Sequence, residues 1–455
     1  MRRALALLLL IAGCGAGSPA ATPTATAART TTRPSPSPSP VTATDWTTYG
    51  GNAQRSSAVA GPDPSRPAVA WTAKLDGKVN ASPLVVSGRV IAATQGGSLY
   101  ALDLVSGRVA WRRHLAPPVP GSALPCGNID PISFTGTPVY DRRTGLVFAV
   151  ATVPGVRHVL YAVRADTGTL AWSRTADAPG ADPATHLQRA ALLVSGATVY
   201  VAYGGNYGDC GQYQGRVVAA STDGTGPLRT FTVPTSREAG IWAASGPALL
   251  PGGDLLVSTG NGAASGGAWD KSDSVLRLSP LLTLKDGFAP TEWAKENSDD
   301  ADLGSMGPLL LPGASRVVAA GKRGSVFLLD VAHLGGVGGQ LAKLSDCQAY
   351  GGGAAMTGVV LLPCEQGLTQ VVVDGDSLRR GWRADVIGSP LVVGSTAWVV
   401  DQDGKATGVS VRNGQRVAQL SVGAATRFAK PAYSLGFLLL PTKAGVVAVR
   451  LSQSS

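Results

Sequence analysis

The feature that most constrains the fold is an internal repeat. Residues 96–111 read Gly-Gly-Ser-Leu-Tyr-Ala-Leu-Asp-Leu-Val-Ser-Gly-Arg-Val-Ala-Trp. About sixty residues later, residues 160–172 repeat the pattern as Leu-Tyr-Ala-Val-Arg-Ala-Asp-Thr-Gly-Thr-Leu-Ala-Trp. Each copy predicts a strand, a turn at a glycine and a second strand that carries a tryptophan. A repeat of this length indicates an array of similar units rather than a set of unrelated domains.

The first complete unit covers residues 82–115 and predicts four short strands. Gly-containing turns separate these strands, as in consecutive hairpins. No stretch of about 12 or more residues shows a clear helical periodicity, so the sequence predicts an all-β fold. The four expected strands are 82–86, 89–94, 98–104 and 109–115.

Counting the units predicts an eight-bladed β-propeller of four-stranded antiparallel blades. The last unit has only three strands before the chain ends at Ser455, and Val69–Leu75 supplies a matching strand near the other end. We therefore expect this N-terminal strand to complete the last blade and close the ring, whereas a linear array would need capping repeats. The later units open at Gly136, Ala190, Ser245, Met306, Gly353, Gly388 and Ala429.

The repeat also carries a recognisable motif. The first copy contains Ala101-x-Asp103-x-x-x-Gly107-x-x-x-Trp111, and the second contains Ala162-x-x-x-Asp166-Thr167-Gly168-x-x-x-Trp172 with its aspartate displaced. These motifs resemble the tryptophan-docking motif of quinoprotein-type (PQQ-like) β-propellers. Asp45-Trp46-Thr47-x-Tyr49-Gly50-Gly51 is similar to the usual opening of such propellers. The resemblance covers roughly residues 45–451, and we assign residues 45–455 to the propeller.

The resemblance implies that each motif tryptophan packs against a glycine turn of the neighbouring blade. A tryptophan buries a large apolar area, and its indole N–H can donate to a backbone carbonyl. We therefore expect five tryptophans to be blade-packing residues: Trp71, Trp111, Trp172, Trp293 and Trp382.

The N-terminus predicts export and a membrane anchor. Met1-Arg2-Arg3 precedes a short apolar run, which is too short to span a membrane. Ile11-Ala12-Gly13-Cys14 resembles the bacterial lipobox, so residues 1–13 are predicted to be a lipoprotein signal peptide and Cys14 the lipidated residue. An ordinary secretory signal is the alternative. Residues 14–44 are rich in Ala, Thr, Ser and Pro and predict a disordered tether, with glycosylation of the tether left open. The expected location is extracytoplasmic, lipid-anchored to the cell membrane.

The charge of the chain bears on the kind of partner that it binds, and its cysteines bear on whether it holds disulfides or a metal ion. The formal net charge is +10, but the basic residues form no run longer than a pair, so we expect no nucleic-acid partner. With Cys14 lipidated, four cysteines remain and allow three pairings. We pair Cys347 with Cys364, which lie within one blade, and therefore Cys126 with Cys210. A metal site is the rival interpretation of these cysteines, although no Cys-x-x-Cys spacing supports it.

The resemblance to quinone-dependent dehydrogenases implies PQQ, a calcium ion and a ring of two adjacent cysteines. No Cys-Cys pair occurs in this chain, so we predict no cofactor, with PQQ and calcium as the alternative. Residues 297–302 (Asn-Ser-Asp-Asp-Ala-Asp) could offer oxygen ligands to calcium, but we interpret them as a solvated acidic loop. Gly321-Lys322-Arg323-Gly324 lacks the spacing of a phosphate-binding loop and predicts a hairpin turn.

Function is expected where the repeat is interrupted by long loops, at residues 117–134, 206–214 and 260–271. The candidate ligand- or partner-binding residues on these loops are Asn128, Tyr207, Asp209, Tyr213 and Trp269. We predict a monomeric binding or scaffold protein for an unidentified protein or envelope component, without catalysis. In architecture it resembles the quinoprotein-like lipoprotein of outer-membrane-protein assembly. The alternative is a PQQ-dependent dehydrogenase that oxidises an alcohol or a sugar.

Overall fold

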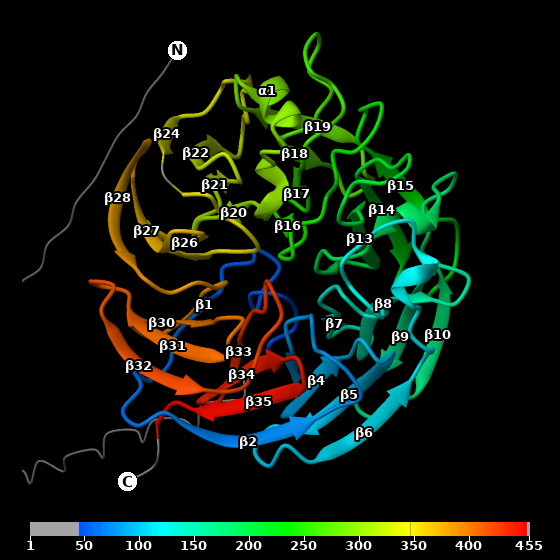
Figure 1. The fold of residues 1–455 in the computed structure, drawn as a ribbon, viewed down its shortest axis with the longest axis vertical. Coiled ribbons are helices and arrows are strands. Elements are labelled where there is room, and N and C mark those ends of the chain that lie inside the picture. The colour runs from blue at the N-terminus through cyan, green and yellow to red at the C-terminus, as the bar shows by residue number, and fades with distance from the viewer. Residues whose placement is uncertain (1–44, 346, 453–455) are drawn as a thin grey trace, which may run out of the picture. The chain divides into compact units, whose positions relative to one another are not determined.

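The described part of the chain is an eight-bladed β-propeller, as the repeat count predicts (Figure 1). The computed structural model describes residues 45–345 and 347–452. The predicted signal peptide (1–13), the lipidation site Cys14 and the predicted tether (14–44) lie outside the described residues. Each blade is a sheet of four or five strands, and consecutive strands within a blade pair antiparallel.

The strands follow one another blade by blade. The first blade contains β3 (Leu84–Val86), β4 (Arg89–Ala93), β5 (Ser98–Asp103) and β6 (Val109–His114), and the second contains β7 (Val139–Asp141), β8 (Leu146–Val153), β9 (Arg157–Arg164) and β10 (Leu170–Thr175). The third blade contains β11 (His186–Leu187), β12 (Leu193–Ser195), β13 (Thr198–Gly205), β14 (Arg216–Ser221) and β15 (Arg229–Thr232). The fourth contains β16 (Ala248–Leu249), β17 (Leu255–Thr259), β18 (Ser274–Leu278) and β19 (Leu284–Ala289), with β23 (Gly336–Val337) added at its edge. The fifth blade contains β20 (Leu309–Leu310), β21 (Arg316–Ala320), β22 (Ser325–Asp330) and β24 (Ala342–Ser345), and the sixth contains β25 (Ala354–Met356), β26 (Val359–Cys364), β27 (Gly367–Asp374) and β28 (Ser377–Ala384). The seventh blade contains β29 (Leu391–Val393), β30 (Thr396–Val400), β31 (Lys405–Ser410) and β32 (Arg416–Ser421), with β1 (Ala58–Val59) added at its edge. The eighth contains β33 (Ala432–Ser434), β34 (Phe437–Thr442) and β35 (Gly445–Arg450), with β2 (Ala68–Lys74) as its fourth strand.

Helices are short and lie in the connections. The α-helix α1 spans Trp293–Ser298, and three 3-10 turns span Gly121–Ala123, Pro183–Thr185 and Leu303–Ser305. Of the residues that the structure describes, none belongs to a helix long and apolar enough to cross a membrane.

The inner strands are buried on both faces because a neighbouring blade covers each face. In β5, Leu99 packs into the cluster shared with the next blade, and Leu102 packs into the cluster shared with the last blade. Successive side chains of a strand point to opposite faces, so one apolar run serves both interfaces. Most residues of the outer strand β6 are exposed, because the neighbouring blades do not cover it as they cover the inner strands.

The N-terminal segment closes the ring. Strand β2 pairs antiparallel with β35, from Ala68 opposite Arg450 to Lys74 opposite Gly445. Figure 1 shows these two strands, the blue and the red end of the described chain, side by side. Strand β1 adds a second link by pairing in parallel with β29. The first and last segments of the propeller therefore hold each other in place, as the sequence predicts.

Residues 46–57 run through the centre of the ring (Figure 1). Arg55 is fully buried there and donates hydrogen bonds to the carbonyl oxygens of Pro247 (2.9 Å) and Leu192 (2.9 Å), which belong to different blades. Tyr49 is buried beside it, and the Lys430 ammonium lies 5.1 Å from the centre of the Tyr49 ring. This segment therefore occupies the middle of the propeller, where it bonds to more than one blade.

Four tryptophans link neighbouring blades in one way. Their indole N–H groups donate to backbone carbonyl oxygens of the next blade: Trp71 to Leu104 (2.9 Å), Trp111 to Ala165 (3.0 Å), Trp172 to Thr222 (3.2 Å) and Trp382 to Val411 (2.8 Å). Their rings lie against turn glycines of the same blades, namely Gly107, Gly168, Gly224 and Gly414.

Trp293, the fifth predicted blade-packing tryptophan, does not link blades in this way. It is the first residue of α1 and is buried within a connection, whereas the other four lie on outer strands. A docking tryptophan needs an outer-strand position that faces the next blade's glycine turn. Trp293 comes after the outer strand β19 has ended.

Candidate functional site

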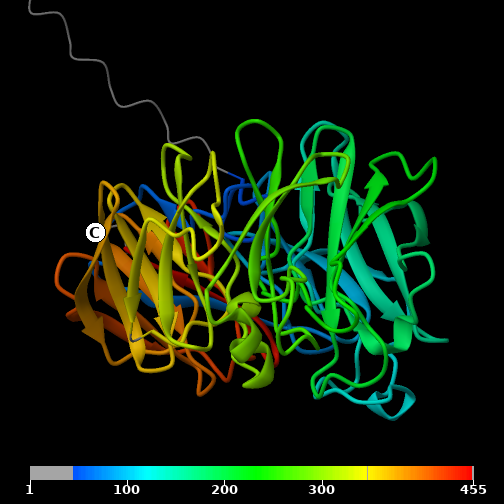
Figure 2. The same cartoon turned by 90° about the horizontal axis from the view of Figure 1, so that it is seen from above.

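A cavity of about 1020 Å³ lies on one face of the propeller, and we call it the funnel. Because the strands of a blade run antiparallel, the turn between its second and third strands opens on the same face as the connection to the next blade. Residues from both kinds of loop line the funnel, such as Gln95 after β4 and Phe428 before β33. Figure 2 shows α1 and the loop after β6 projecting on one side of the propeller.

The funnel wall mixes charged, amide and aromatic side chains contributed by many blades. Its principal lining residues are Lys78, Asn80, Gln95, Asn128, Arg189, Asn206, Tyr207, Asp209, Tyr213, Trp242, Asn261, Asp299, Asp300, Asp302, Lys322, Arg323, Gln348, Tyr350, Glu365, Arg427, Phe428 and Lys443.

One corner of the funnel is a neutralised acidic cluster. Asp302 is only 2% exposed, accepts the backbone N–H of Asn261 at 2.8 Å and forms an ion pair with Lys322. Burial disfavours the Lys322 ammonium, but attraction to Asp302 and hydrogen bonds to Asp300 and Asp302 outweigh it and raise the pKa of Lys322. Arg323 binds Asp299 at 2.6 Å. Each of the three aspartates therefore has an ion-pair partner on the facing turn, although Lys322 serves both Asp300 and Asp302.

This corner corrects the interpretation of residues 297–302 as a solvated acidic loop. Asp299 and Asp300 are accessible, but Asp302 is buried because the following 3-10 turn directs the chain inward. The Gly321–Gly324 stretch is the hairpin turn between β21 and β22, as expected, and it carries Lys322 to Asp302.

A second layer of carboxyl groups lies behind the corner. Asp273 is fully buried and accepts the backbone N–H of Leu303 at 2.8 Å, while its other oxygen has no hydrogen-bond partner among the described residues. Burial, together with the nearby Asp302 carboxylate, raises the pKa of Asp273 well above its usual range. Burial likewise raises the pKa of Glu296 to about 7. Neither side chain lines the funnel.

An aromatic and cationic group lies elsewhere on the wall. The rings of Phe428 and Tyr350 stack with centroids 6.4 Å apart, and Trp242 lies 6.1 Å from Phe428. The Arg427 guanidinium lies 5.0 Å from both stacked rings. The Arg189 guanidinium lies 5.8 Å from the Phe428 ring. Burial lowers the pKa of Arg189 to about 10, which leaves it charged at neutral pH.

Four of the five predicted ligand-face residues line the funnel: Asn128, Tyr207, Asp209 and Tyr213. Trp269 does not. Its indole N–H donates to Ser274 Oγ at 3.0 Å, and the Lys271 ammonium lies 3.4 Å from its ring centre. The loop 260–271 therefore folds back onto its own blade at β18, although its Asn261 does reach the funnel.

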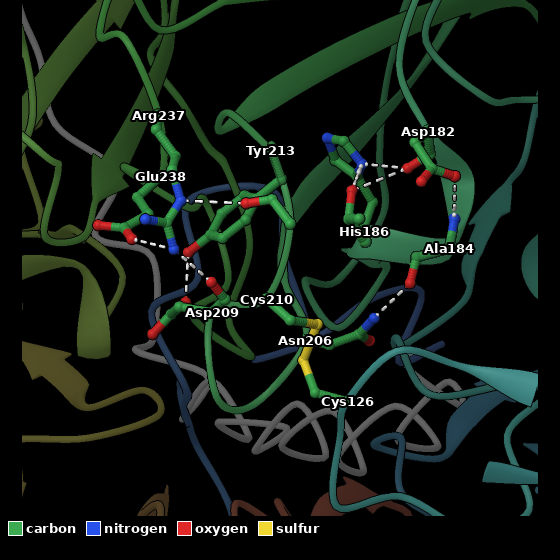
Figure 3. Close-up of a disulfide and its surroundings, with 12 residues drawn as sticks. Cys126, Asp182, Ala184, His186, Asn206, Asp209, Cys210, Tyr213, Arg237 and Glu238 are labelled. Atoms are coloured by element: carbon green, nitrogen blue, oxygen red, sulfur yellow. Dashed lines mark hydrogen bonds and ion pairs between the residues drawn. A yellow bond between two sulfur atoms is a disulfide. The ribbon is translucent and has the colours of Figure 1, made fainter. Parts of the chain in front are cut away.

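A disulfide fixes the rim of the funnel (Figure 3). Cys126 is bonded to Cys210, which joins the loop after β6 to the loop after β13, and Cys347 is bonded to Cys364. This is the pairing that the sequence predicts. Tyr213 donates a hydrogen bond to Asp209, and burial together with that carboxylate raises the pKa of Tyr213.

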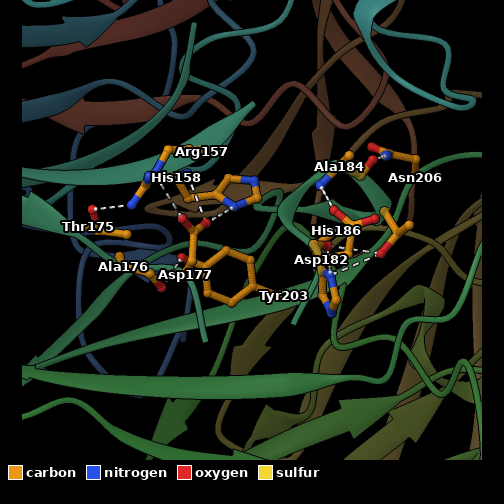
Figure 4. Close-up of polar contacts among 11 residues, drawn as sticks. Arg157, His158, Thr175, Ala176, Asp177, Asp182, Ala184, His186, Tyr203 and Asn206 are labelled. Carbon is orange, nitrogen blue, oxygen red and sulfur yellow. Dashed lines mark hydrogen bonds and ion pairs between the residues drawn. The ribbon is translucent and has the colours of Figure 1, made fainter. Parts of the chain in front are cut away.

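Two buried histidines support the same region from behind (Figure 4). The ring of Tyr203 lies 5.1 Å from that of His158 and 6.4 Å from that of His186. His158 Nδ1 is 2.8 Å from a carboxylate oxygen of Asp177, and His186 Nδ1 is 2.8 Å from the carbonyl oxygen of Asp182. Neither histidine lines the funnel, so both act as structural residues under its wall.

The sequence prediction missed several lining residues that the geometry makes prominent. Each lies in a connection before an inner strand or in a turn between a second and a third strand. Those positions are the signal that could have found them, because the propeller topology sends both to one face. The missed residues are Arg189, Trp242, Lys322, Tyr350, Arg427 and Phe428.

Similarity to known proteins identifies the type of propeller that this chain forms. The chain folds as a PQQ-like β-propeller. A family model described as outer membrane protein assembly factor BamB matches residues 29–144. The search of curated proteins finds no match to the sequence.

Solved structures share the fold at low identity. Quinohemoprotein alcohol dehydrogenase from Comamonas testosteroni is 13% identical (TM-score 0.69; 90% of this chain and 81% of that chain). A europium-containing methanol dehydrogenase is 15% identical (TM-score 0.67; 89% and 97%). BamB from Moraxella catarrhalis is 15% identical (TM-score 0.60; 84% and 99%). These likenesses show the PQQ-like fold, which both dehydrogenases and BamB adopt.

Three observations on the funnel bear on the quinone and calcium pair that the resemblance implies. Among the described residues, no group of three or more His, Cys, Asp and Glu side chains is arranged to hold a metal ion. The buried carboxylate, Asp302, already binds the Lys322 ammonium, which would repel a divalent cation. Cys126 and Cys210, which bond at the rim, are 84 residues apart and form no ring of adjacent cysteines.

Proposed function

We propose that this PQQ-like propeller is a non-catalytic binding protein that holds an envelope protein at its funnel. The observation that carries the proposal is the pairing inside the funnel. Of the lining carboxylates that the structure describes, the deeply buried one is Asp302, and an ammonium and a backbone N–H occupy its oxygens. Burial raises the pKa of Asp302, even though the Lys322 ammonium and the Asn261 N–H lower it. A substrate would have to compete with both partners for the carboxylate before Asp302 could act as a general base.

The rim suits a protein partner. Tyr207 is 70% exposed at the funnel mouth, beside the loop that the Cys126–Cys210 bond holds. A large aromatic side chain presented on a constrained loop is typical of residues that anchor protein interfaces. The match to the BamB family model over residues 29–144 is a further reason to look for a partner in the cell envelope.

We also propose that the protein is exported and anchored through Cys14. The lipobox-like Ile11-Ala12-Gly13-Cys14 supports the anchor, and two disulfides are consistent with an oxidising compartment. Replacing Cys14 with Ser should release the protein from the membrane fraction, measured by immunoblotting of fractionated cells. An unchanged membrane fraction would contradict the anchor.

Site-specific photo-crosslinking in intact cells tests the binding function. A photoreactive amino acid at Tyr207 should capture a defined partner, identified by mass spectrometry. The same group at Leu435 is the matched control, because this exposed residue lies in the turn between the first two strands of its blade, on the opposite face. No adduct at Tyr207, or equal adducts at both positions, would overturn the proposal.

The dehydrogenase alternative has its own test. Calorimetry with PQQ and Ca²⁺ should show no binding at micromolar concentrations, because the Lys322 ammonium already pairs with Asp302, the buried carboxylate of the funnel. Saturable uptake of PQQ, with turnover of an alcohol or a sugar, would replace the binding proposal with the enzymatic one.

A further inference from the structure

The cations of the funnel fall into two groups. Lys322 and Arg323 bind carboxylates of residues 299–302. Among the described residues, no carboxylate lies within ion-pair distance of the four other lining cations. The lining cations that have no ion pair among the described residues are therefore Lys78, Arg189, Arg427 and Lys443, while the carboxylates of Asp209 and Glu365 also line the funnel.

Arg189 is the unusual member of that group. It is only 6% exposed, yet it has no carboxylate partner among the described residues. Its guanidinium donates to the carbonyl oxygens of Thr135 (3.0 Å) and Arg427 (3.2 Å), which accounts for two of its five N–H donors. A buried guanidinium with spare donors is costly unless an anion completes its hydrogen bonds.

Arg55, the other buried arginine at the centre, makes a useful contrast. Its donors reach Thr48 Oγ1 and the carbonyl oxygens of Pro247, Leu192 and Tyr49. Arg55 does not line the funnel. Its hydrogen bonds are completed by the protein itself, so it serves the structure. Arg189 faces the funnel with donors still available.

Arg427 extends the same site toward solvent. It is exposed, but its guanidinium is held 5.0 Å from the rings of both Tyr350 and Phe428. Contact with the aromatic rings restricts the side chain before any ligand arrives, which reduces the entropy lost on binding. Arg189 donates to the backbone carbonyl of Arg427, and both guanidinium groups lie near the Phe428 ring, at 5.8 and 5.0 Å from its centre.

We infer that the Arg189–Arg427–Phe428 unit binds a carboxylate of an acidic polypeptide segment from the partner. This inference rests on the proposed binding function and names the chemistry of its partner. The planar guanidinium fork matches a carboxylate, and the stacked rings offer an apolar surface to a neighbouring side chain. A polypeptide suits the site because the funnel is wide, at about 1020 Å³, and continues to the exposed Tyr207 at its rim.

Titration calorimetry with the full mature chain in detergent tests the site. The probe is the capped peptide Glu-Glu-Phe-Glu, and Gln-Gln-Phe-Gln is its uncharged match. We expect the acidic peptide alone to bind and Arg427→Gln to weaken it about tenfold, the effect of one charged hydrogen bond. Arg412→Gln is the control on the opposite face, because exposed Arg412 lies in the turn between β31 and β32.

Arg189→Gln should weaken binding of the acidic peptide more than Arg427→Gln does. Thermal unfolding shows whether this variant of a buried residue folds. Since Arg427 is exposed, its variant keeps the test valid even if Arg189→Gln does not fold. Equal binding of both peptides, unchanged binding by Arg427→Gln, or tighter binding of inorganic phosphate than of the acidic peptide would overturn the inference. A Tyr207 adduct that persists in Arg427→Gln cells would leave the binding function standing and remove this site.

Discussion

The contact between Trp111 and Gly168 offers the sharpest test of how the blades hold together. Gly168 has a φ of +72°, and a Cβ placed on it would lie 2.7 Å from Cδ2 of Trp111. Gly145 in the same blade has nearly the same backbone, with a φ of +71°, but nothing lies within 4 Å of such a Cβ. Both glycine N–H groups donate to the carbonyl oxygen four residues earlier at 2.9 Å. Gly145→Ala is therefore a matched control for Gly168→Ala.

The expected free energies follow from these two environments. An alanine at positive φ costs about 1–2 kcal/mol, partly offset by about 0.4–1 kcal/mol from the restricted unfolded chain. Gly145→Ala should thus lower the free energy of unfolding by about 1 kcal/mol. Gly168→Ala adds an overpacking cost of about 1–3 kcal/mol, since the tryptophan ring must move. Moving the ring also weakens the hydrogen bond from Trp111 to Ala165, which is worth about 1 kcal/mol.

Equilibrium urea unfolding followed by tryptophan fluorescence measures both variants against the parent protein. Gly168→Ala should be about 2–5 kcal/mol less stable than the parent and clearly less stable than Gly145→Ala. If the two variants agree within about 0.5 kcal/mol, the tryptophan contact does not hold the blades together, and the motif needs another explanation.

Three further predictions concern stability. Cys126→Ser opens a separation of 84 residues and Cys347→Ser one of 17, so loop entropy predicts losses of about 4.5 and about 3 kcal/mol in urea unfolding; the reverse order would contradict this. Burial lowers the pKa of His186, so the unfolded chain takes up a proton at this histidine more readily than the folded chain as the pH falls through about 6.5. Stability at pH 5.5 should therefore drop less in His186→Gln than in the parent or in exposed His333→Gln, and an unchanged pH dependence would refute this. A chain that starts at residue 45 keeps β2 and should stay resistant to protease, whereas a chain that starts at residue 76 lacks β2 and should be digested. Equal resistance of the two chains would show that β2 does not close the ring.

The fold was predictable because its signals are local. Turn glycines, short apolar strands and a repeated tryptophan recur along the chain, and counting them indicates eight blades. The closing strand could be found in the same way, since Val69–Leu75 resembles the outer strand of a complete unit, and the structure places β2 at Ala68–Lys74. Pairing Cys347 with Cys364 needed only their common blade.

The funnel was only partly predictable, because its chemistry depends on loops from many blades. Loop length pointed to Asn128, Tyr207, Asp209 and Tyr213, which line the funnel, but also to Trp269, which does not. A long loop can turn toward the axis or fold back on its own blade. Residue spacing in the sequence carries no information about that choice.

Ring closure decided the rest. Arg189 and Arg427 are 238 residues apart in the chain, and each alone predicts a solvated surface cation. Closing the propeller brings them together beside Phe428 and buries Arg189. The sequence by itself determined the repeated blade, because each blade's strands and turns follow from neighbouring residues. Only the tertiary structure decided which charged side chains are buried and which have no ion pair among the described residues, since both depend on how residues from different parts of the chain meet.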